Sequence, residues 1–469
     1  MLMDRYAPED VFAPVPELAG QTDPELKALD VLLDDDQLFQ QVKADLARRF
    51  PHTADRGRHS TPVEAILRLL LVKHLHNWSF QETEERVADS LVLRWFCRVY
   101  FRRVPDDTTL IRWSQLIRPE TLEALNERVV QLAVRARVTS GRKLRVDATC
   151  VPTTIHHPTD SGLLVDSVRV LSRIMQRAKP VLAQTRKDAA ELCQSHLRSA
   201  RRIAQVLHRL LRRKGEEKLS EQRELYQHLV QTTEEVVQQS ERVSQALRRR
   251  SEQIAQSLRE QVQQVLPLVR RVITQTRTRV LEGKKVASEE KVLSLFEPHT
   301  RVIPRHKGGA DVEFGRLVTL DEVEGGIITR FEVLEQPNEH GQAEEALAHH
   351  QKLFGHPPRI LAGDRGIRSP TTQHTLEEAG VKTVAIPAVG KVSAQRRAVE
   401  RSPSFRRAYR WRAGIEGRIN SLRRDYGLRR CAYHGMSGLK RWLGWGILAN
   451  NVDHIAQAQV TRSRKKQAA

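Results

Sequence analysis

A long stretch without strand patterns, between residues 160 and 286, divides this chain and limits the folds open to it. The stretch is dense in Arg, Gln, Glu, Leu and Val, and no proline occurs from residue 181 to residue 266. Its apolar residues recur at spacings of three, four or seven, which is typical of packed helices. We therefore expect a helical insertion over 161–285, built as a helical hairpin that turns near residues 213–217.

The role of this insertion stays open at the level of sequence. Its basic clusters, at residues 198–202, 209–214 and 248–250, suit either DNA binding or solvated helix faces. Dimerisation, clamping of DNA and a purely structural arm are the alternatives.

Strand patterns lie on both sides of the insertion. Residues 143–151 alternate, with Leu144 and Val146 on one face and Asp147 on the other. An aspartate is disfavoured within a strand, so Asp147 is either an exposed acid at an edge or a functional one. Two later strands are expected over 312–322 and 326–334, joined as an antiparallel hairpin.

The remaining elements alternate between helix and strand. We expect a helix over 343–354, a strand over 359–363 that ends at Asp364, a helix over 371–379 and a strand over 382–387. The order predicts a mixed α/β domain in which Asp364 follows directly on a buried strand.

A polar stripe follows these elements near the C-terminus. On a helix, Tyr409, Arg412, Glu416, Asn420 and Arg423 share one face, and the opposite face is apolar. A single carboxylate flanked by arginines on one helix face suits a site that binds a metal ion and a phosphate together. A solvent-exposed helix can have the same pattern. Glycine inside a helix costs roughly 1 kcal/mol, so a close approach is expected at two further positions of this helix, Gly414 and Gly417.

The N-terminal third reads as helical. Residues 1–25 contain scattered prolines and little periodicity, which predicts a disordered lead, and residues 26–135 predict a compact helical domain. Ser79 and Asp106 are expected helix caps. Arginines alternate with aromatic residues over 94–103; we expect the arginines to contact DNA phosphates and the aromatic residues to lie in the core.

Charge narrows the class of partner. The chain has 78 Lys and Arg against 57 Asp and Glu, a net charge of +21, which favours nucleic acid over a small molecule. No apolar run is long enough to span a membrane, so no membrane partner is expected. The acidic N-terminus is not a signal peptide, and the four cysteines lack metal or disulfide spacing, so a cytoplasmic protein is expected. Residues 456–469 are expected to form a basic tail.

Three motifs carry a family resemblance. The spacing Tyr409-x2-Arg412-x3-Glu416-x6-Arg423 is similar to the Tyr-x2-Arg-x3-Glu-x6-Lys signature of bacterial insertion-sequence DDE transposases, with arginine in the place of lysine. Asp147 and Asp364-Arg365-Gly366 resemble the two aspartate motifs of the same family. Residues 62–96 and 104–110 resemble its N-terminal helical domain. The resemblance covers roughly residues 55–160 and 285–455.

The resemblance implies a ribonuclease H-like catalytic domain over 140–160 and 286–455, preceded by a DNA-binding helical domain and interrupted by the helical insertion. It implies a DNA transposase that cleaves at transposon ends and transfers the strands into target DNA. The expected partners are double-stranded DNA, as terminal inverted repeats and as target, and further copies of the chain in a homodimer or larger assembly.

The same resemblance assigns roles to seven residues. It implies that Asp147, Asp364 and Glu416 are catalytic and bind Mg²⁺ or Mn²⁺, as two ions, because two-metal phosphoryl transfer uses carboxylate oxygens. The residues expected to bind DNA phosphates are Tyr409, Arg412, Arg423 and Arg365. A ribonuclease H-like endonuclease without joining activity, and a non-catalytic DNA-binding scaffold, remain alternatives.

Overall fold

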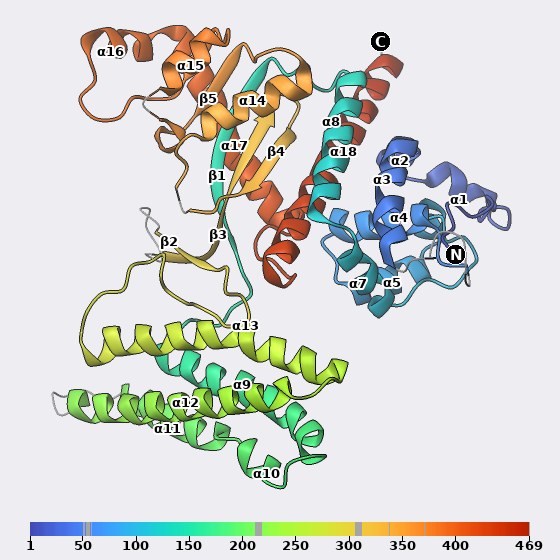
Figure 1. Cartoon of the computed structure of the whole chain (residues 1–469). Coiled ribbons are helices and arrows are strands. Elements are labelled where there is room, and N and C mark those ends of the chain that lie inside the picture. The colour runs from blue at the N-terminus through green and yellow to red at the C-terminus, as the bar shows by residue number, and fades with distance from the viewer. Residues whose placement is uncertain are drawn as a thin grey trace. The chain divides into compact units, whose positions relative to one another are not determined.

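The computed structural model describes residues 1–49, 52, 57, 59–211, 218–304, 312–336, 338–369 and 371–468 (Figure 1). The chain divides into two compact units. One, here the sheet unit, comprises Met1–Pro152 and Arg316–Ala469, and the other, here the helical unit, comprises Thr153–Gly315. The helical unit therefore extends beyond the expected insertion of 161–285 at both ends.

The sheet is open and contains both parallel and antiparallel strands, in agreement with the expected mixed α/β class. Strands β1, β5 and β6 are parallel, and β4 runs antiparallel to β3. The strand order is β3-β1-β5-β6, with β4 on β3, while β2 pairs with the first residues of β3, Val312 to Gly315, inside the helical unit. The strand bounds are β1 Lys143–Pro152, β2 Arg301–Pro304, β3 Val312–Val323, β4 Ile327–Val333, β5 Ile360–Gly363 and β6 Thr383–Ala385. The expected hairpin is thus confirmed as β3 and β4.

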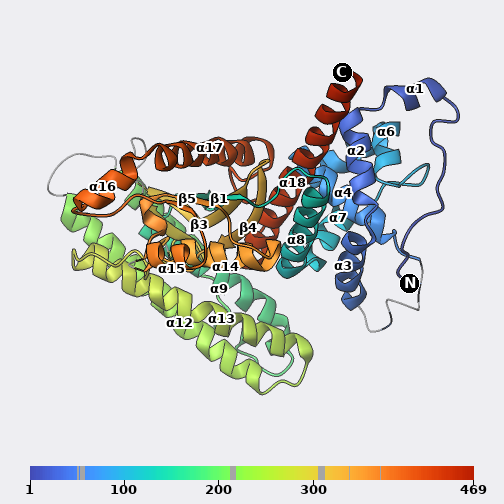
Figure 2. The same ribbon diagram turned by 90° about the horizontal axis from the view of Figure 1, so that it is seen from above.

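Strand β1 lies in the middle of this sheet and both of its faces are covered. Helix α17 (Pro403–Asp425) contacts β1, β5 and β6 on one face, while α14 (Gln342–Phe354) and α15 (Thr372–Glu378) pack on the other, as Figure 2 shows. The face of β1 that alternation marks as polar is therefore buried, and Asp147 is only 8% exposed. The interpretation of Asp147 as an exposed edge residue is excluded.

The N-terminal helices share one hydrophobic core with the sheet. This core runs from Leu29 through Leu122 and Val146 to Ala456. Its helices are α2 Pro24–Leu33, α3 Asp36–Leu46, α4 Val63–Leu75, α5 Phe80–Asp89, α6 Leu91–Phe96, α7 Asp107–Leu116, α8 Pro119–Arg135 and α18 Gly435–Gln467. Helix α8 packs against both α18 and β4, so residues 26–135 are part of the sheet unit rather than a separate compact body.

Local cap signals are confirmed in this region. Ser79 and Glu82 form a reciprocal capping box at the start of α5. The Asp106 carboxylate accepts from the Thr109 N–H at the start of α7. These caps depend on residues three positions apart, which is why the sequence alone reveals them.

The two ends of the chain differ from expectation. Residues 1–25 are not a disordered lead: helix α1 (Pro16–Gln21) lies there, and Val11 is fully buried against Tyr100. Residues 456–469 are not a separate tail, because α18 continues to Gln467 and buries Val460. In both cases contacts with distant residues supply the order that local periodicity does not indicate.

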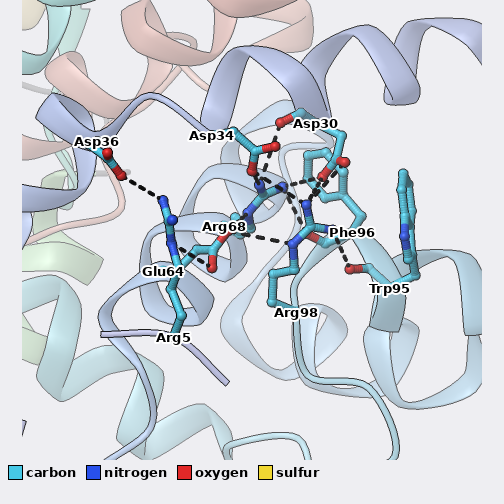
Figure 3. A network of polar contacts seen from close by, with 9 residues as sticks. All are labelled: Arg5, Asp30, Asp34, Asp36, Glu64, Arg68, Trp95, Phe96 and Arg98. Carbon is cyan, nitrogen blue, oxygen red and sulfur yellow. Dashed lines mark hydrogen bonds and ion pairs between the residues drawn. The ribbon is translucent and has the colours of Figure 1, made fainter. Parts of the chain in front are cut away.

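A buried network of ions joins α2, α4 and the turn after α6 (Figure 3). The guanidinium of Arg68 is completely buried and contacts Asp30 at 2.6 Å, Asp34 at 2.8 Å and Glu64 at 3.1 Å. Arg98 contacts the same three acids, at 2.8 Å for Asp30.

This network corrects the expectation for the arginines of residues 94–103. Arg98 lies in the network, Arg94 donates to three backbone carbonyls, and Arg102 pairs with Glu9 at 2.5 Å. Arg98 and Arg102 are thus paired with carboxylates distant in sequence and Arg94 with nearby carbonyls, so these three arginines stabilise the fold. Arg103 is exposed, and its expected contact with DNA stays a prediction. Among the aromatic residues, Phe96 is buried as expected, but Phe101 is 58% exposed.

The helical unit is a bundle with its own core. Helix α9 packs against α11, α12 and α13, and Leu171, Val236 and Val262 lie in the shared core. The bounds are α9 Asp160–Ala183, α10 Ala189–Leu192, α11 Leu197–Leu211, α12 Lys218–Arg248 and α13 Gln253–Thr276. The helical insertion is confirmed, with more helices than one hairpin; the turn expected near 213–217 lies outside the described residues.

No helix in the described part of the chain is long and apolar enough to cross a membrane.

Candidate active site

The register between two parallel strands brings the two aspartates together. Val146 on β1 pairs with Gly363 on β5, so Asp147 and Asp364 follow at adjacent positions on neighbouring strands. Gly363 is required at this position, because a Cβ there would lie 2.1 Å from a side-chain carbon of Ile367. The sheet thus brings two carboxylates to one place, although they lie 217 positions apart in sequence.

Helix α17 adds the third acid and a cation. The guanidinium of Arg412 is the common partner: its Nη2 lies 3.0 Å from Asp147 and 3.5 Å from Asp364, and its Nη1 lies 3.5 Å from Glu416. Arg412 and Asp147 are nearly buried, whereas Asp364 and Glu416 are about half exposed. All three acids expected to be catalytic therefore meet around one side chain.

The electrostatics of the site show an excess of negative charge. Burial raises the pKa of Asp147 above its usual range, and the carboxylates of Asp364 and Glu416 raise it further. The Arg412 charge and a hydrogen bond from the Ala148 N–H act in the opposite direction. One guanidinium thus faces three carboxylates, and Arg412 Nε is buried without a hydrogen-bond partner among the described residues.

A fourth carboxyl group, Glu339, lies beside these acids and was missed by the sequence analysis. Its Oε2 would lie 2.9 Å from a Cβ on Gly366, the last residue of the second aspartate motif. Burial raises the pKa of Glu339 to about 7, and the charges of Asp147 and Asp364 raise it as well. Glu339 lies in the loop before α14, where no periodicity or motif distinguishes it. The contact with Glu339 also explains Gly366.

A second set of ions fixes α17 to the sheet. Glu322 on β3 is buried and accepts two hydrogen bonds from Arg145 on β1, at 2.6 and 2.8 Å. Arg145 also donates to the Trp411 carbonyl at 2.6 Å. Gly414 makes this possible, since a Cβ there would lie 2.4 Å from Arg145 Nη1. The close approach expected at Gly414 is confirmed, but the one expected at Gly417 is wrong, because a Cβ there meets nothing within 4 Å.

The four residues expected to bind phosphate have different surroundings in the structure. Tyr409 stacks on Phe405 at 6.1 Å, in the cluster where α17 packs on β5 and β6. Arg423 donates from Nη2 to Thr149 Oγ1 at 2.8 Å and to the Cys150 carbonyl at 3.0 Å, both on β1. Arg365 is exposed directly after Asp364. Only Arg412 is in direct contact with the three acids in the structure as described.

The carboxylate side chains of this site are of the chemical type that binds divalent cations. Carboxylate oxygens are the ligands that Mg²⁺ and Mn²⁺ prefer, and the mutual repulsion of these acids favours a bound cation. Among the described residues, however, no three acidic, histidine or cysteine side chains cluster closely enough to hold an ion as they stand. The acids are instead spaced around the Arg412 guanidinium.

Comparison with known proteins identifies the family of the chain but does not test the arrangement of the three acids. Residues 17–116 match the family model described as "Transposase domain (DUF772)". A protein of Rhizobium meliloti named "Uncharacterized protein ORF8 in nfe locus" is 32% identical over 154 residues, which are 32% of this chain and 70% of the relative. No solved structure gives a significant match. On the family-model match and this relative, the chain belongs to the transposase family.

Proposed function

We propose that the chain is a DNA transposase that cleaves at the ends of its own element and joins the freed 3′ ends to target DNA. One observation carries the proposal: Asp147, Asp364 and Glu416, from three separate segments, all contact Arg412. Acids that converge in this way, where β1 and β5 stop pairing and on a covering helix, suit phosphoryl transfer in a ribonuclease H-like domain.

In this proposal the three acids hold two divalent cations, Mg²⁺ or Mn²⁺. Such ions supply Lewis-acid activation of the scissile phosphate and of the attacking oxygen. The residues of the chain orient the substrate: Arg412, released from part of its ion pairing, and the exposed Arg365 bind phosphate oxygens. Arg423 positions the DNA strand further along α17. Double-stranded DNA is the substrate, and two paired ends require at least two copies of the chain.

The first experiment is a strand-transfer assay with the element's own ends and a target plasmid. Asp147→Asn, Asp364→Asn and Glu416→Gln should each abolish Mg²⁺-dependent cleavage and joining while retaining DNA binding. Glu378→Gln, at an exposed glutamate of α15, is the matched control and should retain activity. Normal cleavage by all three acid variants would refute the triad.

The same assay separates the two alternatives. Nicked ends without a joined product would indicate an endonuclease rather than a transposase. DNA binding without cleavage by the unmodified chain would indicate a scaffold.

A second experiment tests the cation site without requiring activity. Arg412→Gln removes the one cation among the three acids, so the variant should unfold at a lower temperature than the unmodified chain and gain more stability from added Mg²⁺. Combining Arg412→Gln with Asp147→Asn and Asp364→Asn should remove that gain. An equal Mg²⁺ effect in all forms would refute cation binding by these acids.

A further inference from the structure

A cavity separate from the three acids lies within the sheet unit. It has a volume of about 680 Å³ and is lined by residues of α4 and α5, of the end of α17 and the loop after it, and of α18. Five of its thirteen lining residues are cationic, and none of the described residues that line it is acidic. Such a cavity selects an anionic ligand.

Lys73 is the innermost cation of this cavity. It is only 3% exposed, and its ammonium lies 4.8 Å from the ring centres of Phe80 and Trp442 and 5.7 Å from that of Tyr433. Its ammonium donates no hydrogen bond to any described residue, although Glu82 exerts a long-range attraction. Burial lowers the pKa of Lys73 to about 8. An ammonium held against three aromatic faces, with no hydrogen bond to a described residue, favours a ligand that brings a hydrogen-bond acceptor.

Both aromatic rings and arginines line this cavity. Trp78, Phe80 and Tyr433 are partly exposed and line the cavity, and Phe80 and Tyr433 stack on each other at 6.0 Å. The other lining residues include Arg423 and Arg424, and the arginines at 429 and 430; Arg424 is also paired with Asp425 at 2.7 Å. Aromatic faces beside arginines are the combination that binds single-stranded nucleic acid, because bases stack on rings while phosphates pair with guanidinium groups.

Arg423 connects this cavity with the candidate active site. It lines the cavity and also donates to Thr149, two residues after Asp147 on β1. Arg423 lies seven residues beyond Glu416 on α17, which corresponds to about 10 Å along a helix. A DNA strand whose phosphate reaches Glu416 therefore needs to extend only a short distance to reach the cavity.

We propose that this cavity binds one unpaired nucleotide of the DNA strand that enters the active site. The base lies against Trp78 and Phe80, with an acceptor atom near Lys73, and the flanking phosphates pair with the arginines. The proposal rests on the proposed function, since it supplies a subsite for the strand that is cut.

The test is binding of a labelled oligodeoxythymidine of about ten nucleotides, measured by fluorescence anisotropy without divalent ions so that no cleavage occurs. Trp78→Ala should weaken binding about tenfold, the usual effect of losing one stacked base. Trp78→Phe should restore most of the affinity, and both variants are first checked for an unchanged unfolding midpoint. Phe101→Ala, at an exposed aromatic residue outside the cavity, is the matched control and should bind normally.

A second probe, the same backbone with abasic sites, separates the base from the phosphates. Trp78→Ala should not change its affinity, whereas Arg424→Ala should weaken binding of both probes. Equal affinity of Trp78→Ala and the unmodified chain for the thymidine probe would overturn the proposal. So would stronger competition by polyglutamate than by DNA, which would indicate an acidic protein partner.

Failure of the cavity proposal and failure of the proposed function give different results in these experiments. If the binding results refute the cavity proposal, the proposal that the three acids catalyse cleavage still stands. Failure of the acid variants to affect cleavage would refute the catalytic assignment without changing these affinities.

Discussion

Replacing Arg68 by methionine should destabilise the sheet unit by about 3 kcal/mol, because it leaves buried carboxylates without their main cation. Arg68 is completely buried, and the side chains of Glu64 and Asp30 are only 7% and 13% exposed. Removing one partner of a buried ion pair costs about 3–5 kcal/mol. Asp34 is 54% exposed and adds little. Arg98 still faces the remaining acids, so the low end of the range applies.

The matched control is Arg5→Met. Arg5 contacts Glu64 at 3.4 Å, but its side chain is 44% exposed, so its loss should cost under about 1 kcal/mol. Urea unfolding followed by tryptophan fluorescence measures both variants, and the difference in free energy of unfolding is the quantity compared.

A third variant tests the cause. Adding Asp30→Asn and Glu64→Gln to Arg68→Met removes the uncompensated charges and should recover part of the lost stability. Equal free energies of unfolding for Arg68→Met and Arg5→Met would refute the reasoning. A combined variant less stable than Arg68→Met alone would show that packing, rather than charge, accounts for the effect.

Two further predictions concern the sheet and α17. Burial raises the pKa of Asp321 to about 7, so the folded state holds the proton of this carboxyl group more tightly than the unfolded chain does. The resulting gain in free energy of unfolding is fully present below about pH 4 and is lost as the pH rises through 7. Asp321→Asn should remove this loss of stability, which is on the order of 3 kcal/mol. Urea unfolding at about pH 5 and about pH 8 measures the loss in the unmodified chain and in the variant. The same pH dependence in both would contradict the burial of a titrating acid at this position. Gly417→Ala should stabilise α17 by up to about 1 kcal/mol, whereas Gly414→Ala should gain nothing or destabilise it, because its Cβ displaces Arg145 from the Trp411 carbonyl. Thermal unfolding compares the two, and equal shifts would argue against the tight contact at Gly414.

The local elements of the candidate site were predictable. The spacing of residues on α17 places Arg412 and Glu416 one turn apart, and the structure has their ion pair at 3.5 Å. Alternation in β1 and the end of β5 located Asp147 and Asp364 at strand positions. Their adjacency depends on strand register, which neither segment specifies by itself.

Other parts of the site could not be read from sequence. Glu339 lies in a loop without periodicity, so nothing local distinguishes it from any exposed glutamate. The Lys73 ammonium lies 4.8 Å from the ring centre of Trp442 although their segments are distant in sequence. The pattern of arginines at 94, 98 and 102 suggests side chains that are available to bind phosphate. In the structure Asp30 pairs with Arg98 and Glu9 pairs with Arg102.

By itself, the sequence determined most of the helices and strands, two helix caps, the helical character of the insertion and the cationic character of the chain. These features depend on backbone hydrogen bonds and on side chains within about one turn or one strand, so their signals are local. Only the tertiary structure decided which acids meet at Arg412, which arginines are already paired within the fold, and where a buried lysine has no hydrogen-bond partner among the described residues. A charge is neutralised by whichever group packing brings near it, and packing joins residues that are hundreds of positions apart.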